Sequence, residues 1–201
     1  MNFKSILVVA GEPHSIFLEI FFKSIKKNKF KKPIILIASK NLLIEQMKKL
    51  NFDLKFKIIK KEDIQGKELN NNYINLINVK YKFTHAFQKI SARSNQYISK
   101  CFEIALQLTS KNKDFSLING PINLKYFLNG LSLGITEYLA KHNKSKNEDA
   151  MLIFTKKLAV SPITTHLALN DVAKNITKHK IFTQVNLIVD FYKKKFGKIP
   201  R

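Results

Sequence analysis

The sequence predicts an α/β fold with a mixed, mostly parallel sheet and flanking helices. Short, continuous apolar runs recur along the chain, and such runs are typical of strands that are buried on both faces. Segments with helical periodicity separate these runs, so that strands and helices alternate. Hydrophobic residues make up 45% of the 201 residues, which is sufficient for a globular core.

The first 60 residues show this alternation most clearly. An apolar run at the start of the chain ends in the turn Gly11-Glu12-Pro13, and a helix is expected next with Ser15 as its N-cap. The same pair of signals then recurs, which favours a parallel sheet with helices on its faces. The expected strands are residues 5–10, 33–38 and 52–59, and the expected helices are residues 16–27 and 40–50.

The rest of the chain adds further strands, a hairpin and long helices. Residues 60–72 are polar and are expected to form a loop, and Gly120-Pro121 stops the strand before it. Two short apolar runs close to each other indicate a hairpin, which makes the fold mixed. The expected strands are residues 73–79, 115–119, 151–154 and 158–161, and the expected helical segments are residues 86–110 and 170–196, the latter with a break near Thr177.

The end of the chain predicts an incomplete domain. The last helix stops at Phe196-Gly197, and only four residues follow. A parallel α/β domain normally continues into another strand at such a point. We therefore expect that the fold is incomplete at its C-terminus and that a downstream portion is absent.

The net charge of +22 invites an assignment to nucleic-acid binding. Of the 36 basic residues, however, only Arg93 and Arg201 are arginines, whereas proteins that read grooves and phosphates use the arginine fork heavily. The lysines are also scattered over the whole chain. We therefore expect no nucleic-acid partner, although the charge would attract small anionic substrates.

Cysteine usage and hydropathy indicate a cytoplasmic protein without membrane spans. The single Cys101 cannot form an internal disulfide or a cysteine metal site, and its place in a helical apolar pattern indicates a buried structural residue. The apolar runs are far shorter than the roughly 20 residues of a membrane helix, and no leader precedes them.

Three turns that contain glycine follow apolar segments, at Gly11, Gly120 and Gly134. Ligands of open α/β folds bind at the carboxyl ends of strands, so these turns could meet at one crevice. Neither a dinucleotide fingerprint (GxGxxG) nor a P-loop occurs. Each turn can equally be a structural break.

Among the five histidines, His166 has the context of a functional residue. It follows an apolar strand and stands next to threonine hydroxyls that can orient its ring, as metal ligation or proton transfer requires. A structural role is the alternative, and His14 is ambiguous in the same way. No pair has the i, i+4 spacing of a zinc helix. The remaining histidines are expected to be solvated or structural: His85, His142 and His179.

Five short motifs occur in a fixed order along the chain. They are Gly11-Glu12-Pro13, Asn119-Gly120-Pro121-Ile122-Asn123, Gly134-Ile135-Thr136-Glu137-Tyr138-Leu139-Ala140, Met151-Leu152, and Thr164-Thr165-His166-Leu167-Ala168-Leu169. Each alone is a weak signal, whereas the five in this order and spacing are specific. On these residues the chain resembles the 4-hydroxythreonine-4-phosphate dehydrogenase family of pyridoxal phosphate biosynthesis. The resemblance covers essentially all 201 residues but only the first part of the family's usual length.

This resemblance implies an isocitrate/isopropylmalate-dehydrogenase-like fold, with residues 1–201 as the N-terminal part of a two-subdomain enzyme. It implies a homodimer that uses NAD or NADP and a divalent metal (zinc, magnesium, cobalt or manganese) held by three histidines. The substrate is a small phosphorylated hydroxy-amino acid, 4-phosphooxy-threonine, whose secondary alcohol is oxidised to a β-keto acid that loses carbon dioxide. A metal on the hydroxyl would stabilise the alkoxide from which hydride leaves.

The resemblance assigns roles to two residues. His166 matches the first metal-ligand histidine of the family, and Thr136 matches a threonine that contacts the substrate, where its hydroxyl can donate to a phosphate oxygen. Neither catalytic nor coenzyme-binding residues can be assigned. The other two metal-ligand histidines and the nicotinamide contacts of the family lie beyond residue 201, and one histidine cannot hold a catalytic metal. The chain alone is therefore expected to be inactive.

Departures from the family pattern leave two alternatives open. Ile135 stands where family members usually have histidine, and Leu124 stands where lysine is usual, with Lys125 one place later. The loss of a donor at position 135 favours a paralogue that acts on another phosphorylated hydroxy acid. A degenerate, non-catalytic binding protein that is naturally short is the second alternative.

Overall fold

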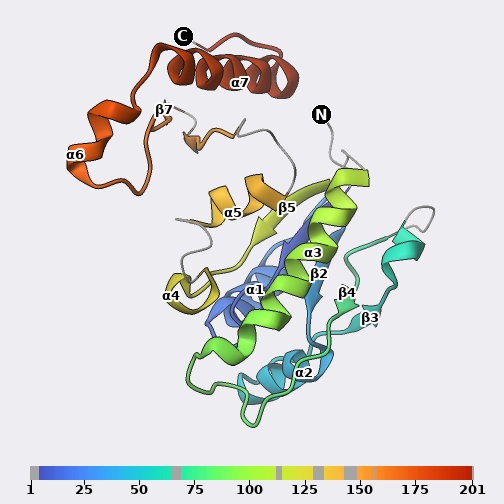
Figure 1. The fold of residues 1–201 in the computed structure, drawn as a ribbon. Coiled ribbons are helices and arrows are strands. Elements are labelled where there is room, and N and C mark those ends of the chain that lie inside the picture. The colour runs from blue at the N-terminus through green and yellow to red at the C-terminus, as the bar shows by residue number, and fades with distance from the viewer. Residues whose placement is uncertain are drawn as a thin grey trace. The chain divides into compact units, whose positions relative to one another are not determined.

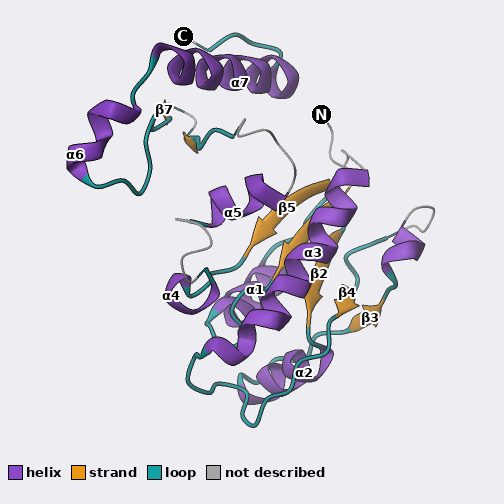
Figure 2. Cartoon of the chain, viewed as in Figure 1, coloured by secondary structure: helices purple, strands orange, loops and turns teal. Residues whose placement is uncertain are grey.

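The computed structural model describes residues 5–64, 69–111, 115–128, 134–142, 149–155 and 157–200. The chain divides into two compact units: an N-terminal unit of residues 2–129 and a C-terminal unit of residues 130–201. Helices and strands alternate in the first unit, whereas the second is mainly helical (Figure 2).

A five-stranded parallel sheet forms the centre of the N-terminal unit, with the strand order β3-β4-β2-β1-β5 (Figure 1). Strand β1 lies between β2 and β5, and its Val8 pairs with Leu36 on one side and Ile118 on the other. The predicted parallel sheet is thus confirmed. The strands are β1 (Ser5–Val9), β2 (Ile34–Ala38), β3 (Phe56–Ile58), β4 (Ile74–Asn78) and β5 (Phe115–Asn119).

Helices cover both faces of this sheet, which accounts for its continuous apolar strands. Alternate side chains of a strand point to opposite faces. Val8 and Leu36 therefore share one face, which packs against α1 (Phe17–Lys27) and α2 (Lys40–Lys49). The long helix α3 (Asn95–Lys111) contacts β1, β2 and β5 and crosses the sheet on the other face (Figure 1). The shorter helical segments of this unit are η1 (Lys61–Ile64), η2 (Ala92–Ser94) and α4 (Leu124–Phe127).

Strand β3 is shorter than predicted, because the chain turns before it. Asn51 has a left-handed backbone (φ 55°) directly after α2, and the N–H of Phe52 donates to the carbonyl of Met47 (2.9 Å). The Phe52 ring packs on Phe22, with 5.4 Å between ring centroids. The first apolar residues of the predicted strand 52–59 thus cover the helical layer and do not pair with β4.

The predicted helix 86–110 begins nine residues later than expected, at Asn95. The carbonyl of Ala86, which a helix would use internally, accepts instead from the Gln46 side-chain amide (2.9 Å). The His14 ring contacts the same carbonyl through Nδ1 (3.3 Å). Tertiary contacts therefore hold the start of the segment in a non-helical conformation, although its sequence permits a helix.

The predicted N-cap of α1 is displaced by one residue. Ile16 is the cap position and makes no side-chain cap bond. The Ser15 hydroxyl donates to the carbonyl of Glu12 (2.8 Å) and accepts from the N–H of Phe17 (3.3 Å). Ser15 thus stabilises the turn between β1 and α1.

The C-terminal unit contains the predicted hairpin and helices. Strands β6 (Ile153–Phe154) and β7 (Ala159–Val160) are antiparallel. The break predicted near Thr177 is confirmed, since the Thr177 side chain caps α7 by accepting from Lys180 (3.2 Å). Gly197, with φ of 64°, ends this helix. The helical segments are α5 (Ile135–His142), α6 (Leu169–Val172), η3 (Ala173–Asn175) and α7 (Lys178–Phe196). No helix in the described ranges combines the length and the apolar composition needed to span a bilayer.

The ends of β1 and β5 approach each other so closely that only glycine fits at two positions. Gly11 has a left-handed backbone (φ 72°), and a Cβ atom there would lie 2.4 Å from the carbonyl oxygen of Pro121. A Cβ atom on Gly120 would lie 2.3 Å from the carbonyl oxygen of Ala10. The N–H of Glu12 donates to Pro121 (2.8 Å), so that the two turns are also joined by a hydrogen bond.

Replacing Gly11 by alanine should therefore destabilise the N-terminal unit strongly. We expect Gly11→Ala to lower its free energy of unfolding by about 2–5 kcal/mol, from left-handed strain and backbone overlap together. Gly197→Ala is the matched control, because Gly197 has a similar φ with open space around it; it should lower the stability of its own unit by only about 1 kcal/mol. Hydrogen exchange of the β1 and α7 amides measures the stability of each unit. Equal losses of stability in the two variants would contradict the close approach of the β1 and β5 turns.

Candidate functional site

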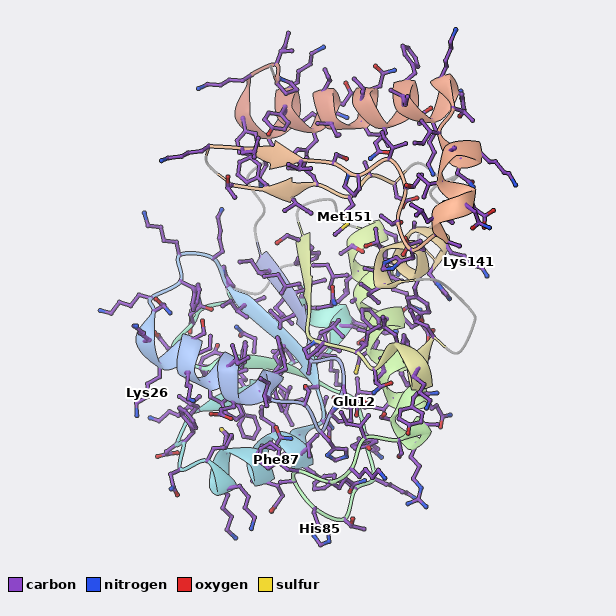
Figure 3. The ribbon with its side chains drawn as sticks, turned by 90° about the vertical axis from the view of Figure 1, so that its left-hand side faces the viewer. Glu12, Lys26, His85, Phe87, Lys141 and Met151 are labelled. Carbon is purple, nitrogen blue, oxygen red and sulfur yellow. The ribbon has the colours of Figure 1, made fainter. Side chains whose placement is uncertain are left out.

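The strand-end turn of the N-terminal unit buries an acidic side chain. Glu12 is 3% exposed, and in Figure 3 it lies inside this unit. Its Oε2 accepts from the Ser94 hydroxyl (3.0 Å), while its Oε1 has no hydrogen-bond partner among the described residues. Burial raises the pKa of this carboxyl, an effect that the hydrogen bonds from Ser94 and the His14 backbone partly offset.

Next to Glu12, the His14 ring joins the turn to the segment before α3. Its Nδ1 contacts the carbonyl of Ala86, so that Nδ1 carries the proton and donates. Its Nε2 then accepts from the Tyr81 hydroxyl (3.0 Å). Burial lowers the pKa of His14 and raises that of Tyr81. Hydrogen bonds at both ring nitrogens favour the structural interpretation of His14.

Gln46 of helix α2 binds the same segment before α3. Its side-chain nitrogen donates to the carbonyls of Pro13 and Ala86, each at 2.9 Å, and the side chain is fully buried. The carbonyl of Ala86 thus receives both Gln46 and His14. The sequence gives no motif for this arrangement, because the three residues belong to separate segments.

A hollow of about 790 Å³ lies between α2 and residues 83–87. The apolar residues Ile44 and Phe87 line it together with His85, and Figure 3 shows His85 at the end of the unit. None of the strand-end turn residues belongs to its lining. His85 is exposed, as its sequence context indicates.

In the C-terminal unit, the segment around Gly134 meets the segment around His166. The Thr165 hydroxyl donates to Oε1 of Glu137 (2.9 Å). A Cβ atom on Gly134 would lie 3.1 Å from Nε2 of His166 and 2.7 Å from Oε2 of Glu137. Thr136 and His166, to which the family resemblance assigns roles, therefore belong to segments in direct contact.

The backbone positions of these two residues differ. Thr136 stands in the first turn of α5 and is half-buried. The N–H of Tyr138 donates to the carbonyl of Gly134 (3.1 Å), the residue before α5. The first N–H groups of a helix have no partner within it. Such a helix start attracts anions. His166 is exposed and has a left-handed backbone (φ 56°), which is uncommon for a residue other than glycine.

Of the three turns that could meet at one crevice, two lie together in one unit. The structure brings Gly11 and Gly120 together within the N-terminal unit, whereas Gly134 belongs to the C-terminal unit. Cys101 is fully buried, as predicted, and burial raises its pKa to about 12, so the thiol is not a nucleophile. His142 and His179 are exposed, in agreement with their sequence context.

The described residues supply part of a metal site at most. His166 offers an exposed imidazole, and Oε2 of Glu137 nearby is buried without a hydrogen-bond partner among the described residues. No cluster of three or more His, Cys, Asp or Glu side chains suited to a metal occurs in the described ranges. A catalytic metal needs about three protein ligands, so His166 fits as one ligand and the coordination is not complete here.

The buried carboxyl of Glu12 should make stability depend on pH. Because its native pKa lies above the ordinary value of 4.5, the native state binds this proton more tightly than the unfolded state. The contribution of the Glu12 carboxyl to stability is complete below pH 4.5 and is lost as pH rises through its native pKa. Glu12→Gln cannot ionise, so we expect its stability relative to the parent chain to increase with pH above 4.5.

Urea unfolding between pH 4 and 8 measures this difference. His14, Tyr81 and Arg93 also act on this network, but they are present in both proteins and largely cancel in the comparison. Ser94→Ala is a second variant. It removes the hydroxyl that donates to Glu12, so the loss of stability above pH 4.5 should become steeper. A stability difference that stays constant with pH would contradict a raised pKa.

Comparison with known proteins gives one consistent family. The family model of the pyridoxal phosphate biosynthetic protein PdxA matches residues 29–200. A 4-hydroxythreonine-4-phosphate dehydrogenase from Sulfurihydrogenibium sp. (strain YO3AOP1) is 33% identical over 194 residues, which are 94% of this chain and 58% of that protein. A D-threonate 4-phosphate dehydrogenase from Pectobacterium atrosepticum is 24% identical over 200 residues, 96% of this chain and 60% of that protein.

The fold agrees with this family. The crystal structure of 4-hydroxythreonine-4-phosphate dehydrogenase from Klebsiella pneumoniae superimposes with a TM-score of 0.75 at 21% identity, covering 95% of this chain and 60% of that one. This likeness confirms the predicted α/β fold class with a mainly parallel sheet. The chain spans about three fifths of the length of the relatives that it matches. By the match over residues 29–200, the chain belongs to the PdxA family of pyridoxal phosphate biosynthetic proteins.

Proposed function

We propose that this chain is the N-terminal part of a dehydrogenase that oxidises 4-phosphooxy-threonine in pyridoxal phosphate biosynthesis. The coenzyme is NAD or NADP, and the site of action is the cytoplasm. Membership of the PdxA family supports the reaction, and the relative from Sulfurihydrogenibium carries the corresponding name. The oxidised alcohol yields a β-keto acid, which loses carbon dioxide.

The observation that carries the proposal is the contact between the Gly134 and His166 segments. It brings the helix start that carries Thr136 into the neighbourhood of an exposed imidazole. The Thr136 hydroxyl and the first N–H groups of α5 would bind the phosphate of the substrate. His166 would be one ligand of a divalent metal, which supplies stabilisation of the substrate alkoxide when bound.

A second candidate substrate is D-threonate 4-phosphate. Ile135 removes a side-chain donor at the helix start where family members usually have histidine. A relative from Pectobacterium atrosepticum, similar over 96% of this chain, is named a D-threonate 4-phosphate dehydrogenase. The two substrates share the phosphate and a hydroxyl but differ in the substituent next to the carboxylate, so one position can decide between them.

We also propose that the enzyme is a homodimer whose interface includes the C-terminal unit. Many large apolar side chains of this unit are exposed, with Leu158 66% and Phe182 68% accessible. Exposed apolar surface of this extent is typical of contact sites. The exposed residues are Met151, Ile153, Phe154, Leu158, Val160, Leu169, Ile176, Ile181, Phe182, Val185, Phe191, Phe196 and Ile199.

Substrate binding tests the role of Thr136. Calorimetric titration of the chain with 4-phosphooxy-threonine should show that Thr136→Val weakens binding about 10- to 100-fold, because a hydrogen bond to a charged phosphate is lost. Thr136→Ser should retain binding, and Thr183→Val on α7 is the matched control.

Parallel titration with D-threonate 4-phosphate decides between the two substrates, since the preferred one binds more tightly. Binding of neither phosphate ester would count against substrate binding by Thr136 and helix α5 of this chain. Equal binding by the Thr136→Val variant and the parent chain would refute the role of Thr136.

Sedimentation equilibrium tests the dimer. The chain should approach twice its monomer mass as concentration rises, and the double variant Leu158→Ser/Phe182→Ser should weaken this association at least about tenfold, because two large apolar side chains leave the interface. Ile16→Ser is the control, since Ile16 is 65% exposed but belongs to the N-terminal unit. A monomer at all concentrations would contradict the proposal.

A further inference from the structure

We propose that Glu137 is a positioning residue, which holds the His166 turn against the first turn of helix α5. The proposal rests on the proposed function for the roles of Thr136 and His166. The contact that Glu137 makes is independent of those roles. Nothing in the sequence pattern separates Glu137 from an ordinary acidic residue in the first turn of a helix, where a carboxylate is favoured.

The first observation is a hydrogen bond between the two segments. The Thr165 hydroxyl donates to Oε1 of Glu137 at 2.9 Å, across 28 residues of sequence. Glu137 immediately follows Thr136, and Thr165 immediately precedes His166. One side-chain contact therefore fixes the spacing between the helix turn that carries Thr136 and the backbone that carries His166.

The second observation concerns the other carboxylate oxygen. Oε2 of Glu137 is buried and has no hydrogen-bond partner among the described residues. It lies 2.7 Å from the position that a Cβ atom on Gly134 would take, and Nε2 of His166 lies 3.1 Å from the same position. Gly134 thus leaves room for both groups, and a side chain there would displace the imidazole or the carboxylate.

The third observation is the backbone of His166 itself. A left-handed conformation (φ 56°) is unfavourable for a residue with a Cβ atom. His166 is exposed, so packing of its own ring contributes little to this conformation. A contact from the preceding residue to a fixed helix supplies the missing constraint, and Thr165 makes such a contact with Glu137.

The three observations together give Glu137 a function in the site. Residues that orient a ligand histidine act through the groups that they hold, and their loss weakens metal binding. Glu137 does so through Thr165, and it acts at the same time on the phosphate-binding end of α5 because it belongs to that turn. It would touch neither the substrate nor the reacting atoms.

The test measures the side-chain resonances of His166 in the full chain by long-range ¹H–¹⁵N NMR. His166→Gln identifies its resonances. Glu137→Leu and Thr165→Val should both shift these resonances, while those of His14 and His179 stay in place. The double variant should resemble either single variant, because both remove the same contact.

Conservative variants separate positioning from general damage. Glu137→Gln keeps an oxygen that accepts from Thr165, and Thr165→Ser keeps the donor, so both should retain the parent His166 resonances. Asp190→Leu removes a carboxylate from α7 of the same unit and is the control for charge. Backbone amide resonances of α7 report whether each variant is folded. Unchanged His166 resonances in folded Glu137→Leu and Thr165→Val would overturn the proposal.

Titration with Co²⁺ in the same spectra distinguishes this proposal from the proposed function. If His166 is a ligand, Co²⁺ broadens its resonances in the parent chain, and Glu137→Leu raises the Co²⁺ concentration required about tenfold or more. If Co²⁺ leaves the His166 resonances unaffected while the variants shift them, the positioning role is supported and the metal role is refuted. If Co²⁺ broadens the His166 resonances equally in all variants and the variants do not shift these resonances, the positioning role is refuted.

Discussion

The close approach of the β1 and β5 turns is the contact on which the N-terminal unit depends. Gly11 and Gly120 let the two backbones meet at a distance that no side chain would allow, and the bond from Glu12 to Pro121 closes the contact. This approach directs the Glu12 side chain inward, where Ser94 is its hydrogen-bond partner. The arrangement of the segment before α3 follows from this turn, since His14 and Gln46 both reach Ala86.

The two units use different physical means to hold their residues in place. In the N-terminal unit, a buried parallel sheet is covered on both faces, and its polar links are almost fully buried. In the C-terminal unit, the contact between Thr165 and Glu137 is only partly buried, and much of α7 is exposed. The relatives are longer than this chain, which spans about three fifths of their length.

The sequence predicted most of the sheet because local patterns determine buried strands. Apolar runs that end at glycine gave β1 and β5 almost to the residue. The start of α3 was predicted wrongly, because long-range hydrogen bonds to Ala86 outweigh local helical preference. The roles of Thr136 and His166 remain predictions. The structure adds that their segments touch, which only a fold can reveal, and that Glu137, already present in the quoted motif, makes the contact.

In the proposed function, short-range groups must provide the specificity, because the net charge does not. The net charge of +22 attracts any small anion, so attraction alone cannot distinguish one phosphorylated acid from another. Discrimination requires groups at fixed positions that become unpaired when the wrong substrate binds. With Ile135 at the helix start, the side-chain donor in that turn is the Thr136 hydroxyl. In the proposed site, the position of the Thr136 hydroxyl relative to His166 depends on the carboxylate of Glu137. The contact that Glu137 makes would therefore matter more here than in a relative with a second donor.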